Sequence, residues 1–163
     1  MAIAQVETPF GVLGIAASAR GVVEVNLGGP IPLDDATTVS DGDRLAAQAL
    51  ADEAAKQFRE YFLGKRKEFD LPLDCALFEE DSFRARALTA LMDVGYGERI
   101  SYGELAEMAG SPRAARAAGT ACSTNPLAII IPCHRVVPAS GGIGSYGGGE
   151  NLKKWLLELE SAI

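Results

Sequence analysis

Residues 132–135, with the sequence Pro-Cys-His-Arg, place Cys133 beside the single histidine of the 163-residue chain, His134. The pair allows three interpretations: a nucleophilic thiol with a base, two ligands of a metal ion, or a buried cysteine with an unrelated neighbour. A cysteine reacts as its thiolate, which a nearby base or a positive charge stabilises. Apolar residues at 129–131 and 136–137 flank the segment, and charged side chains are costly to place inside an apolar strand without a purpose. The sequence therefore favours a reactive thiol.

The sequence offers few residues that could hold a metal ion or a cofactor. The chain has three cysteines (Cys75, Cys122 and Cys133), no CxxC pair and one histidine, whereas a structural zinc site needs about four nitrogen or sulfur ligands. The Gly-rich stretch at 141–149, GGIGSYGGG, lacks the GxxxxGK(S/T) spacing of a phosphate-binding loop and is expected to form a flexible wall. The sequence predicts neither a metal nor a cofactor.

His134 needs a geometry that connects it to the sulfur. Adjacent side chains of an extended segment point to opposite faces, so we expect His134 to reach Cys133 through a bridging water or a relay. The imidazole would in turn need a carboxylate to orient it. Three acidic residues near the C-terminus are candidates for this role: Glu150, Glu158 and Glu160.

The charge is unevenly divided along the chain. The formal net charge of −7 argues at first against nucleic acid as a partner. Residues 1–80 contain seven Lys and Arg against fourteen Asp and Glu, whereas residues 81–163 contain eight of each. The acid-free stretch 110–138 holds three arginines: Arg113, Arg116 and Arg135. Because salt screens charges over about 8–10 Å, this local balance is compatible with phosphate contact of modest, salt-sensitive affinity.

Residues 1–80 predict a small α/β domain. Two β-rich runs surround a turn at residues 18–21, and the Ala-rich stretch 44–62 has Leu45 and Phe58 at helical spacing. No apolar run is long enough for a transmembrane helix, and no export signal is evident at the start. We therefore expect no membrane association and a cytoplasmic location in which the cysteines are free thiols.

Residues 81–163 predict a mainly helical domain. Ser82 can cap a first helix, and Ser101 with Glu104 three residues later forms a capping box at the start of a second one. The chain then ends in an amphipathic helix over residues 150–160.

A further helix, with Ser111 as its cap and Pro112 at its first position, is predicted directly after the capping-box helix. Two short helices joined by a glycine-containing turn are typical of a helix-turn-helix, although many helical hairpins bind nothing. The second helix carries small residues with Arg113 and Arg116 projecting. It is either a tightly packed core helix or one that approaches a DNA backbone closely while an arginine inserts. Because long side chains that read base edges are absent, DNA binding would tolerate many sequences.

The segment IPCHRVV resembles the active-site motif of the O6-alkylguanine-DNA alkyltransferases, also called methylated-DNA–protein-cysteine methyltransferases. The blocks SYGELA, SPRAARAAGTACSTNP, IIIPCHRVV and GIGSYGGGENLKKWLLELE follow one another in the family's order and spacing. Residues 1–80 resemble the family more loosely. The resemblance implies an α/β (α+β) chain with a ribonuclease-H-like α/β domain at 1–80. A mainly helical DNA-binding and alkyl-acceptor domain with a helix-turn-helix would follow at 81–163.

The function implied by this resemblance is DNA repair by direct reversal. After base flipping, Cys133 would take the alkyl group from O6-alkylguanine, and from O4-alkylthymine, in one irreversible step that consumes the protein. The implied partner is alkylated double-stranded DNA, bound in the minor groove with little sequence specificity. The protein would act as a monomer without a cofactor, in the cytoplasm and on the nucleoid when bound to DNA.

The same resemblance assigns roles to individual residues. Cys133 is the acceptor, His134 polarises its thiol through a water, and Glu160 orients His134. Asn125 holds the turn that leads to the active-site segment, and Tyr102 hydrogen-bonds the guanine ring and helps to rotate the nucleotide. Contacts to DNA are further implied for Arg116, which fills the gap left by the flipped base, and for Ala115, Ser111 and Arg135. The base pocket is implied to include Val136, Tyr146 and Gly147.

Two other classes of function remain open. One is a protein that binds the lesion and signals to another repair system, but relatives of that kind lack the cysteine that this chain has at position 133. The other is a thiol hydrolase, which would need a histidine separate from the nucleophile. Some departures from the family pattern concern the pocket. Ala128 stands where some members have a second proline, and Gly147 replaces a frequent serine, so that only a backbone role survives there.

Overall fold

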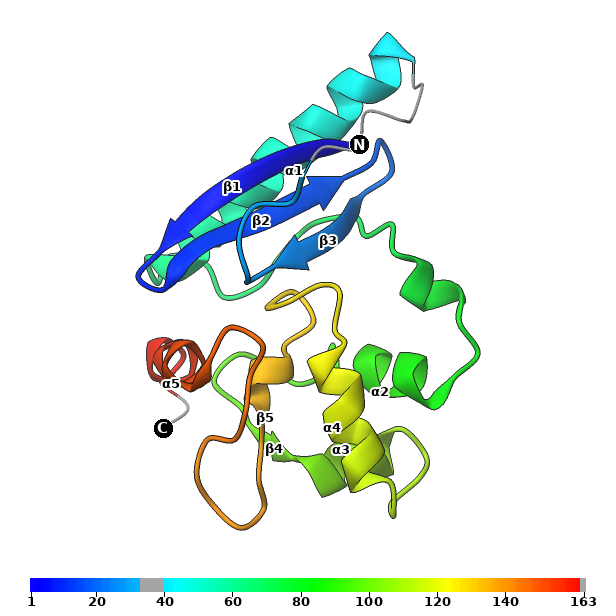
Figure 1. The fold of residues 1–163 in the computed structure, drawn as a ribbon, viewed down its shortest axis with the longest axis vertical. Coiled ribbons are helices and arrows are strands. Elements are labelled where there is room, and N and C mark those ends of the chain that lie inside the picture. The colour runs from blue at the N-terminus through cyan, green and yellow to red at the C-terminus, as the bar shows by residue number, and fades with distance from the viewer. Residues whose placement is uncertain (33–39, 162–163) are drawn as a thin grey trace. The chain divides into compact units, whose positions relative to one another are not determined.

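The computed structural model describes residues 1–32 and 40–161. The chain forms two compact units, Met1–Ala76 and Leu77–Ile163, each of which is described by itself. The sequence places the boundary after residue 80, whereas the structure divides the chain at the start of the 3-10 helix η1 (Ala76–Glu79). The prediction of a mixed α/β chain with a small N-terminal sheet and a helical C-terminal part is confirmed (Figure 1).

The first unit is an antiparallel sheet covered by a long helix (Figure 1). Strands β1 (Ala2–Thr8), β2 (Gly11–Ala17) and β3 (Val22–Asn26) are neighbours in the order β1-β2-β3, and α1 (Asp41–Phe62) packs against them. Gly11 has a φ of 117°, a backbone conformation that the tight turn between β1 and β2 requires and that glycine adopts without strain.

Small side chains let α1 approach the sheet closely. The buried residues of the helix are Ala47, Ala51, Ala54, Ala55, Gln57, Phe58 and Tyr61. Leu45, which stands at helical spacing with Phe58, is 74% exposed, and alanines take the positions against the sheet. The helix also begins earlier than predicted, because the hydroxyl of Ser40 accepts a hydrogen bond of 3.1 Å from the amide of Asp43.

The second unit consists of short helices and one parallel strand pair. Its elements are α2 (Phe83–Leu91), β4 (Ile100–Ser101), α3 (Tyr102–Met108), α4 (Ala115–Ser123), η2 (Cys133–Arg135), β5 (Val136–Val137) and α5 (Glu150–Leu159). In the β4–β5 pair Ile100 lies opposite Val136, and Ser101 lies opposite Val137. This pairing holds the start of α3 beside the end of the Cys-His-Arg segment. No helix in the described part of the chain is long and apolar enough to cross a membrane.

The predicted caps of α2 and α3 are confirmed. The hydroxyl of Ser82 accepts a hydrogen bond of 3.1 Å from the amide of Ala85. Ser101 and Glu104 form both bonds of a capping box: the Glu104 amide donates to the Ser101 hydroxyl at 3.1 Å, and the Ser101 amide donates to the Glu104 carboxylate at 3.4 Å. These bonds satisfy amides at the helix starts that have no partner within the helix.

Helix α4 begins later than predicted and has no side-chain cap at its N-cap residue, Ala114. The amide of Ser111 donates to the carbonyl of Ala106 in α3 at 2.9 Å, and the carbonyl of Ser111 accepts from the amide of Ala114 at 2.9 Å. The prediction that Ser111 caps this helix is wrong, because its backbone closes the turn between the two helices. Helices α3 and α4 pack against each other (Figure 1).

Candidate active site around Cys133

The segment before Cys133 is a tight turn and not the predicted strand. Ile129 has a φ of 71°, and the amide of Ile131 donates to the carbonyl of Leu127 at 2.9 Å. Residues Cys133–Arg135 then form the 3-10 helix η2, closed by a hydrogen bond of 3.0 Å from the Arg135 amide to the Pro132 carbonyl. The apolar residues at 129–131 gain burial within the turn, so they do not need a neighbouring strand.

Asn125 ties this turn together with both ends of its side-chain amide. Its Oδ1 accepts a hydrogen bond of 2.9 Å from the amide of Leu127, and its Nδ2 donates to the carbonyl of Ile131 at 2.8 Å. The same Nδ2 lies 3.2 Å from Sγ of Cys133. A donor directed at the sulfur stabilises the thiolate more than the thiol. Asn125 therefore fixes the turn and at the same time favours ionisation of Cys133.

The thiol of Cys133 is held in a buried setting, with only 6% of the residue exposed. Burial raises the pKa of Cys133, and the Asn125 hydrogen bond and the charge of Lys153 act in the opposite direction. Burial dominates, so the resting protein holds a thiol at neutral pH. Reaction then requires a base that removes the proton when the substrate is in place.

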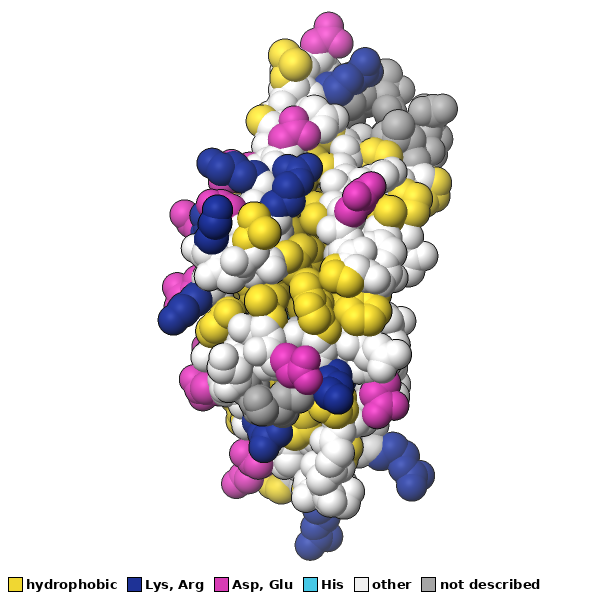
Figure 2. Space-filling model, turned by 90° about the vertical axis from the view of Figure 1, so that its left-hand side faces the viewer, with side chains coloured by type: hydrophobic (Ala, Val, Ile, Leu, Met, Phe, Trp, Pro, Cys, Tyr) yellow, Lys and Arg dark blue, Asp and Glu magenta, His cyan; other side chains and the backbone are white. Residues whose placement is uncertain are grey.

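His134 is fully buried and pairs with Glu160, as Nε2 lies 2.8 Å from Oε2 of that carboxylate. On the face drawn in Figure 2, no histidine is visible. Burial lowers the pKa of His134, and the charges of Arg135 and Lys153 lower it further, although Glu160 acts to raise it. The imidazole is therefore neutral at pH 7, with its proton on Nε2 toward the carboxylate. Nδ1 is a buried acceptor with no hydrogen-bond partner among the described residues.

Glu160 is the carboxylate that meets His134, among the three that the sequence offered. It lies at the C-cap of α5 and is 3% exposed. Glu158 instead faces outward, where its carboxylate lies 4.0 Å from the ammonium of Lys154. The other candidate, Glu150, is the exposed first residue of α5.

Arg135 lies inside the unit, so the prediction that its side chain contacts DNA is wrong. The residue is 8% exposed, and its Nε and Nη2 donate to Oε1 and Oε2 of Glu160 at 2.9 and 3.0 Å. Its Nη1 donates to the carbonyl of Val94 at 2.6 Å. A buried guanidinium requires a paired carboxylate, and the carboxylate next to His134 meets that need.

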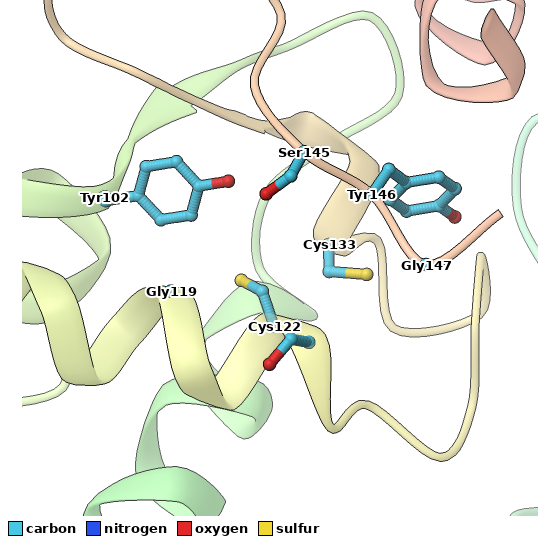
Figure 3. A pocket seen from close by; sticks show the side chains of 8 residues that line it. Tyr102, Gly119, Cys122, Cys133, Ser145, Tyr146 and Gly147 are labelled. Carbon is cyan, nitrogen blue, oxygen red and sulfur yellow. The ribbon is translucent and has the colours of Figure 1, made fainter. Parts of the chain in front are cut away.

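The sulfur of Cys133 borders a cavity of about 200 Å³ (Figure 3). Its lining consists of Tyr102, Gly119, Cys122, Ser123, Cys133, Ser145, Tyr146 and Gly147. Tyr102 and Tyr146 lie on opposite sides of the cysteines in this view. Val136, by contrast, is fully buried outside this lining, and its carbonyl accepts a hydrogen bond from Lys153. The structure thus brings Tyr102, Tyr146 and Gly147 to Cys133.

A second, more open hollow of about 620 Å³ shares part of this lining. Tyr102, Gly119, Ser123 and Ser145 border both spaces, and Ala115 and Arg116 border the second one. Arg116 of α4 is exposed, as is Arg113 in the turn before the helix, whereas Ala118 of α4 is buried. Helix α4 therefore presents a basic, small-residue face next to the cavity. Burial raises the pKa of Tyr102, so its phenol stays protonated and can donate a hydrogen bond.

Two residues of the site have no counterpart in the sequence predictions. Lys153 is fully buried, and its ammonium donates to the carbonyls of Val136 at 2.6 Å and Ser145 at 3.4 Å. Its position between inward-facing leucines of the amphipathic α5 is the signal that could have revealed it. Cys122 lines the cavity from α4, and burial raises its pKa to about 12, which leaves it as an inert thiol.

Fold and site together define a two-unit protein in which a helical C-terminal unit encloses a thiol beside a buried His-Glu-Arg cluster. Residues 82–162 match the family model "6-O-methylguanine DNA methyltransferase, DNA binding domain", and residues 1–75 match "6-O-methylguanine DNA methyltransferase, ribonuclease-like domain". The chain belongs to the 6-O-methylguanine DNA methyltransferase family.

Relatives with known names extend this finding. The chain is 53% identical over 108 residues to a methylated-DNA–protein-cysteine methyltransferase of Mycobacterium leprae, a match covering 66% of this chain and 64% of that protein. It thus spans slightly less than two thirds of that relative. A human protein of the same name is 40% identical over 155 residues, covering 91% of this chain and 67% of the relative. The crystal structure of Mycobacterium tuberculosis OGT in complex with DNA matches with a TM-score of 0.78 and 38% identity. The match covers 98% of this chain and 92% of that one.

Proposed function

We propose that this protein repairs DNA by moving the alkyl group of O6-alkylguanine onto Cys133, once per molecule. The observation that carries the proposal is the Cys133 thiol, which borders a cavity and lies 3.2 Å from the Asn125 amide. It is followed in the chain by His134, whose Nε2 lies 2.8 Å from the carboxylate of Glu160. Family membership supports it, and so does the similarity to the methylated-DNA–protein-cysteine methyltransferases.

The transfer step follows from the groups around the sulfur. A water takes the thiol proton of Cys133 and passes a proton to Nδ1 of His134, where Glu160 stabilises the imidazolium. The thiolate forms a bond to the alkyl carbon while the bond from that carbon to O6 breaks, and the electron pair moves into the guanine ring system. Tyr102 donates a hydrogen bond to the departing base, which takes up one proton to become neutral guanine, and His134 releases to water the proton that it received from Cys133. The products are a thioether on Cys133 and unmodified guanine.

The same chemistry explains why the protein acts once. A thioether carbon is a poor target for the groups of this cavity, so Cys133 is not regenerated. O4-alkylthymine presents the same alkyl–oxygen bond on an exocyclic oxygen, and we include it as a second substrate. The reaction needs no cofactor, since the acceptor is the protein itself.

DNA would bind along α3 and α4, which act as a helix-turn-helix. The target oxygen is stacked inside the duplex, so the nucleotide must rotate out, at a cost of a few kcal/mol. Exposed Arg116 is placed to fill the vacated space from the minor groove, and Ala115 allows a close approach to the backbone. The small side chains of α4 offer few groups for reading bases, which favours binding with little sequence specificity. We expect a monomer that works in the cytoplasm on the nucleoid.

The decisive experiment is to incubate the protein with duplex DNA containing O6-methylguanine and to weigh the peptide that carries Cys133. One added methyl group, restored guanine and no further turnover are expected, and Cys133→Ser should bind the DNA without gaining mass. Binding of wild type without a mass change would instead indicate a lesion-recognition protein. Repeated turnover on esters or amides would indicate a hydrolase, and either result overturns the proposal. O4-methylthymine in the same duplex tests the second substrate.

The DNA contact has its own test in Arg116→Ala, with Arg113→Ala as the control, because Arg113 is an exposed arginine in the turn just before α4. The first variant should slow repair of duplex DNA about tenfold, because loss of the inserted side chain shifts the base-flipping equilibrium by about 1.4 kcal/mol. Repair of single-stranded DNA should hardly change. Equal slowing on both kinds of DNA would contradict the role of Arg116 in base rotation.

A further inference from the structure

The carboxylate of Glu160 binds two side chains, those of His134 and Arg135, and its Oε1 also accepts a hydrogen bond of 3.4 Å from the amide of Gly97. Its Oε2 lies 2.8 Å from Nε2 of His134 and 3.0 Å from Nη2 of Arg135, while its Oε1 accepts from Nε of Arg135 at 2.9 Å. All three side chains are buried. A hydrogen-bond network of this kind has one charge arrangement that avoids an unpaired ion: Arg135 as a cation, Glu160 as an anion and His134 neutral.

We propose that Arg135 is a positioning residue that fixes the protonation state of the His134–Glu160 pair. It holds Glu160 as an oriented carboxylate and keeps His134 as a neutral imidazole whose Nδ1 accepts a proton. The inference rests on the proposed alkyl transfer, in which His134 is the base. It assigns to the arginine of the Cys-His-Arg segment a task inside the protein.

The geometry restricts what the guanidinium can do. Its Nη1 is bound to the Val94 carbonyl at 2.6 Å, and its other two contacts approach the Glu160 carboxylate side-on. A planar fork held at both ends orients the carboxylate in a way that a flexible ammonium cannot. Because Arg135 follows His134 directly in η2, the same short turn supplies the base and the cation that controls its partner.

Other charged groups face this cluster and enter the balance. From α5 the ammonium of Lys153 acts on His134 in the same direction as Arg135, and Glu160 acts against both. The phenol of Tyr96 lies under the guanidinium, with its ring centroid 6.0 Å from Cζ of Arg135. The thiol of Cys133 is the remaining titratable neighbour in η2. Removing the Arg135 charge leaves the anion of Glu160 partly uncompensated, so His134 must bind its proton at higher pH.

The single histidine of the chain makes this measurable. Imidazole ¹⁵N chemical shifts report the tautomer and the titration midpoint of His134 without any assignment problem. In wild type we expect a neutral ring protonated on Nε2 at pH 7. In Arg135→Gln the titration midpoint of His134 should rise by about one pH unit. The acid limb of the pH–rate profile for single-turnover transfer should move to higher pH by the same amount. Below both midpoints this lowers the rate about tenfold, while the rate at high pH changes less.

Two further variants sharpen the experiment. Arg135→Lys keeps the charge and should leave the midpoint near that of wild type, although the rate falls because the fork is lost. Arg86→Met removes an exposed arginine, which lies 3.8 Å from Asp81, and controls for the change in net charge. Its midpoint and rate should equal those of wild type.

An unchanged His134 midpoint in folded Arg135→Gln overturns the inference. If that variant does not fold, the wild-type spectrum decides, because an imidazolium or an Nδ1-protonated ring at pH 7 excludes the proposed state. These spectra need no DNA. They therefore test the role of Arg135 separately from alkyl transfer, which the mass of the Cys133 peptide reports.

Discussion

The two units of the chain differ in what they bury. The Met1–Ala76 unit encloses one polar side chain of the described core, Gln57, whereas the Leu77–Ile163 unit encloses His134, Arg135, Lys153 and Glu160. Gln57 bonds both backbone groups of Asp70: its Nε2 donates to the carbonyl at 3.0 Å, and its Oε1 accepts from the amide at 2.9 Å. Gln57 thus satisfies the backbone of a segment outside the sheet, and it carries no charge.

The buried polar groups of the second unit are ionisable and gather at the segment that carries Cys133: His134 and Arg135 follow it in η2, and Glu160 pairs with both. Burying charge costs several kcal/mol per ion unless the partners are exact in position, so a unit of this size accumulates such groups only where they are paired. The contrast teaches that polar burial alone does not mark a site. In the first unit it joins two segments, and in the second it sets the charge around Cys133.

The largest effect is expected from breaking the ionic cluster. Glu160→Gln leaves the buried guanidinium of Arg135 without its anion, which should lower the free energy of unfolding of the second unit by about 3–5 kcal/mol. Urea unfolding followed by the fluorescence of Trp155, the single tryptophan, reports this unit. Gln57→Ala is the counterpart in the first unit and should cost about 1–3 kcal/mol, measured by hydrogen exchange of residues 1–76. Equal costs would remove the contrast between the two units.

Features that depend on neighbours in sequence were predictable, and the caps show why. The hydroxyl of Ser82 accepts from an amide three residues away, and the hydroxyl of Ser101 does the same with the amide of Glu104. Ser111 resembles them in sequence, but the packing of α3 against α4 draws its backbone into a turn. Tertiary contacts thus override a local signal that is otherwise reliable.

The residues of the candidate site that belong to the family motif could be predicted from the sequence. The residues whose position depends on pairing buried charges were missed. The family resemblance implied a DNA contact for Arg135, yet its partner Glu160 lies 25 positions along the chain. Lys153 meets the carbonyl of Val136 across 17 positions. Spacing along the sequence carries no information about such pairs, so the sequence could name Cys133, His134 and Glu160 from the family motif but not the partners of Arg135 and Lys153.

A smaller effect is expected from Lys153→Met, which keeps the length of the side chain and removes its charge. The ammonium joins the carbonyls of Val136 and Ser145 beside the cavity, and its charge lowers the pKa of Cys133. Without it the thiol should ionise at higher pH, and transfer at pH 7 should slow about tenfold for a displacement of one pH unit. The measurement is the pH dependence of the single-turnover rate.

The matched control for this change is Lys154→Met. Lys154 is the next residue of α5, and its exposed ammonium lies 4.0 Å from the carboxylate of Glu158. An exposed pair of this kind contributes little, so the rate should stay within about twofold of wild type. If both lysine variants slow transfer equally, the charge of the helix as a whole acts on Cys133, and buried Lys153 has no special part.

The smallest expected effect is the dependence of the free energy of unfolding on pH in mildly acidic solution. Burial lowers the pKa of His134, so below about pH 6.5 the unfolded chain binds a proton that the folded protein excludes. The free energy of unfolding must then fall as the pH falls, by at most about 1.4 kcal/mol per pH unit until the folded protein also binds the proton. Urea titrations of Trp155 fluorescence between about pH 7 and pH 5 measure this slope. His134→Gln removes the titrating group and should flatten this slope, whereas equal slopes in the two proteins would mean that the buried imidazole binds its proton over the same pH range as in the unfolded chain.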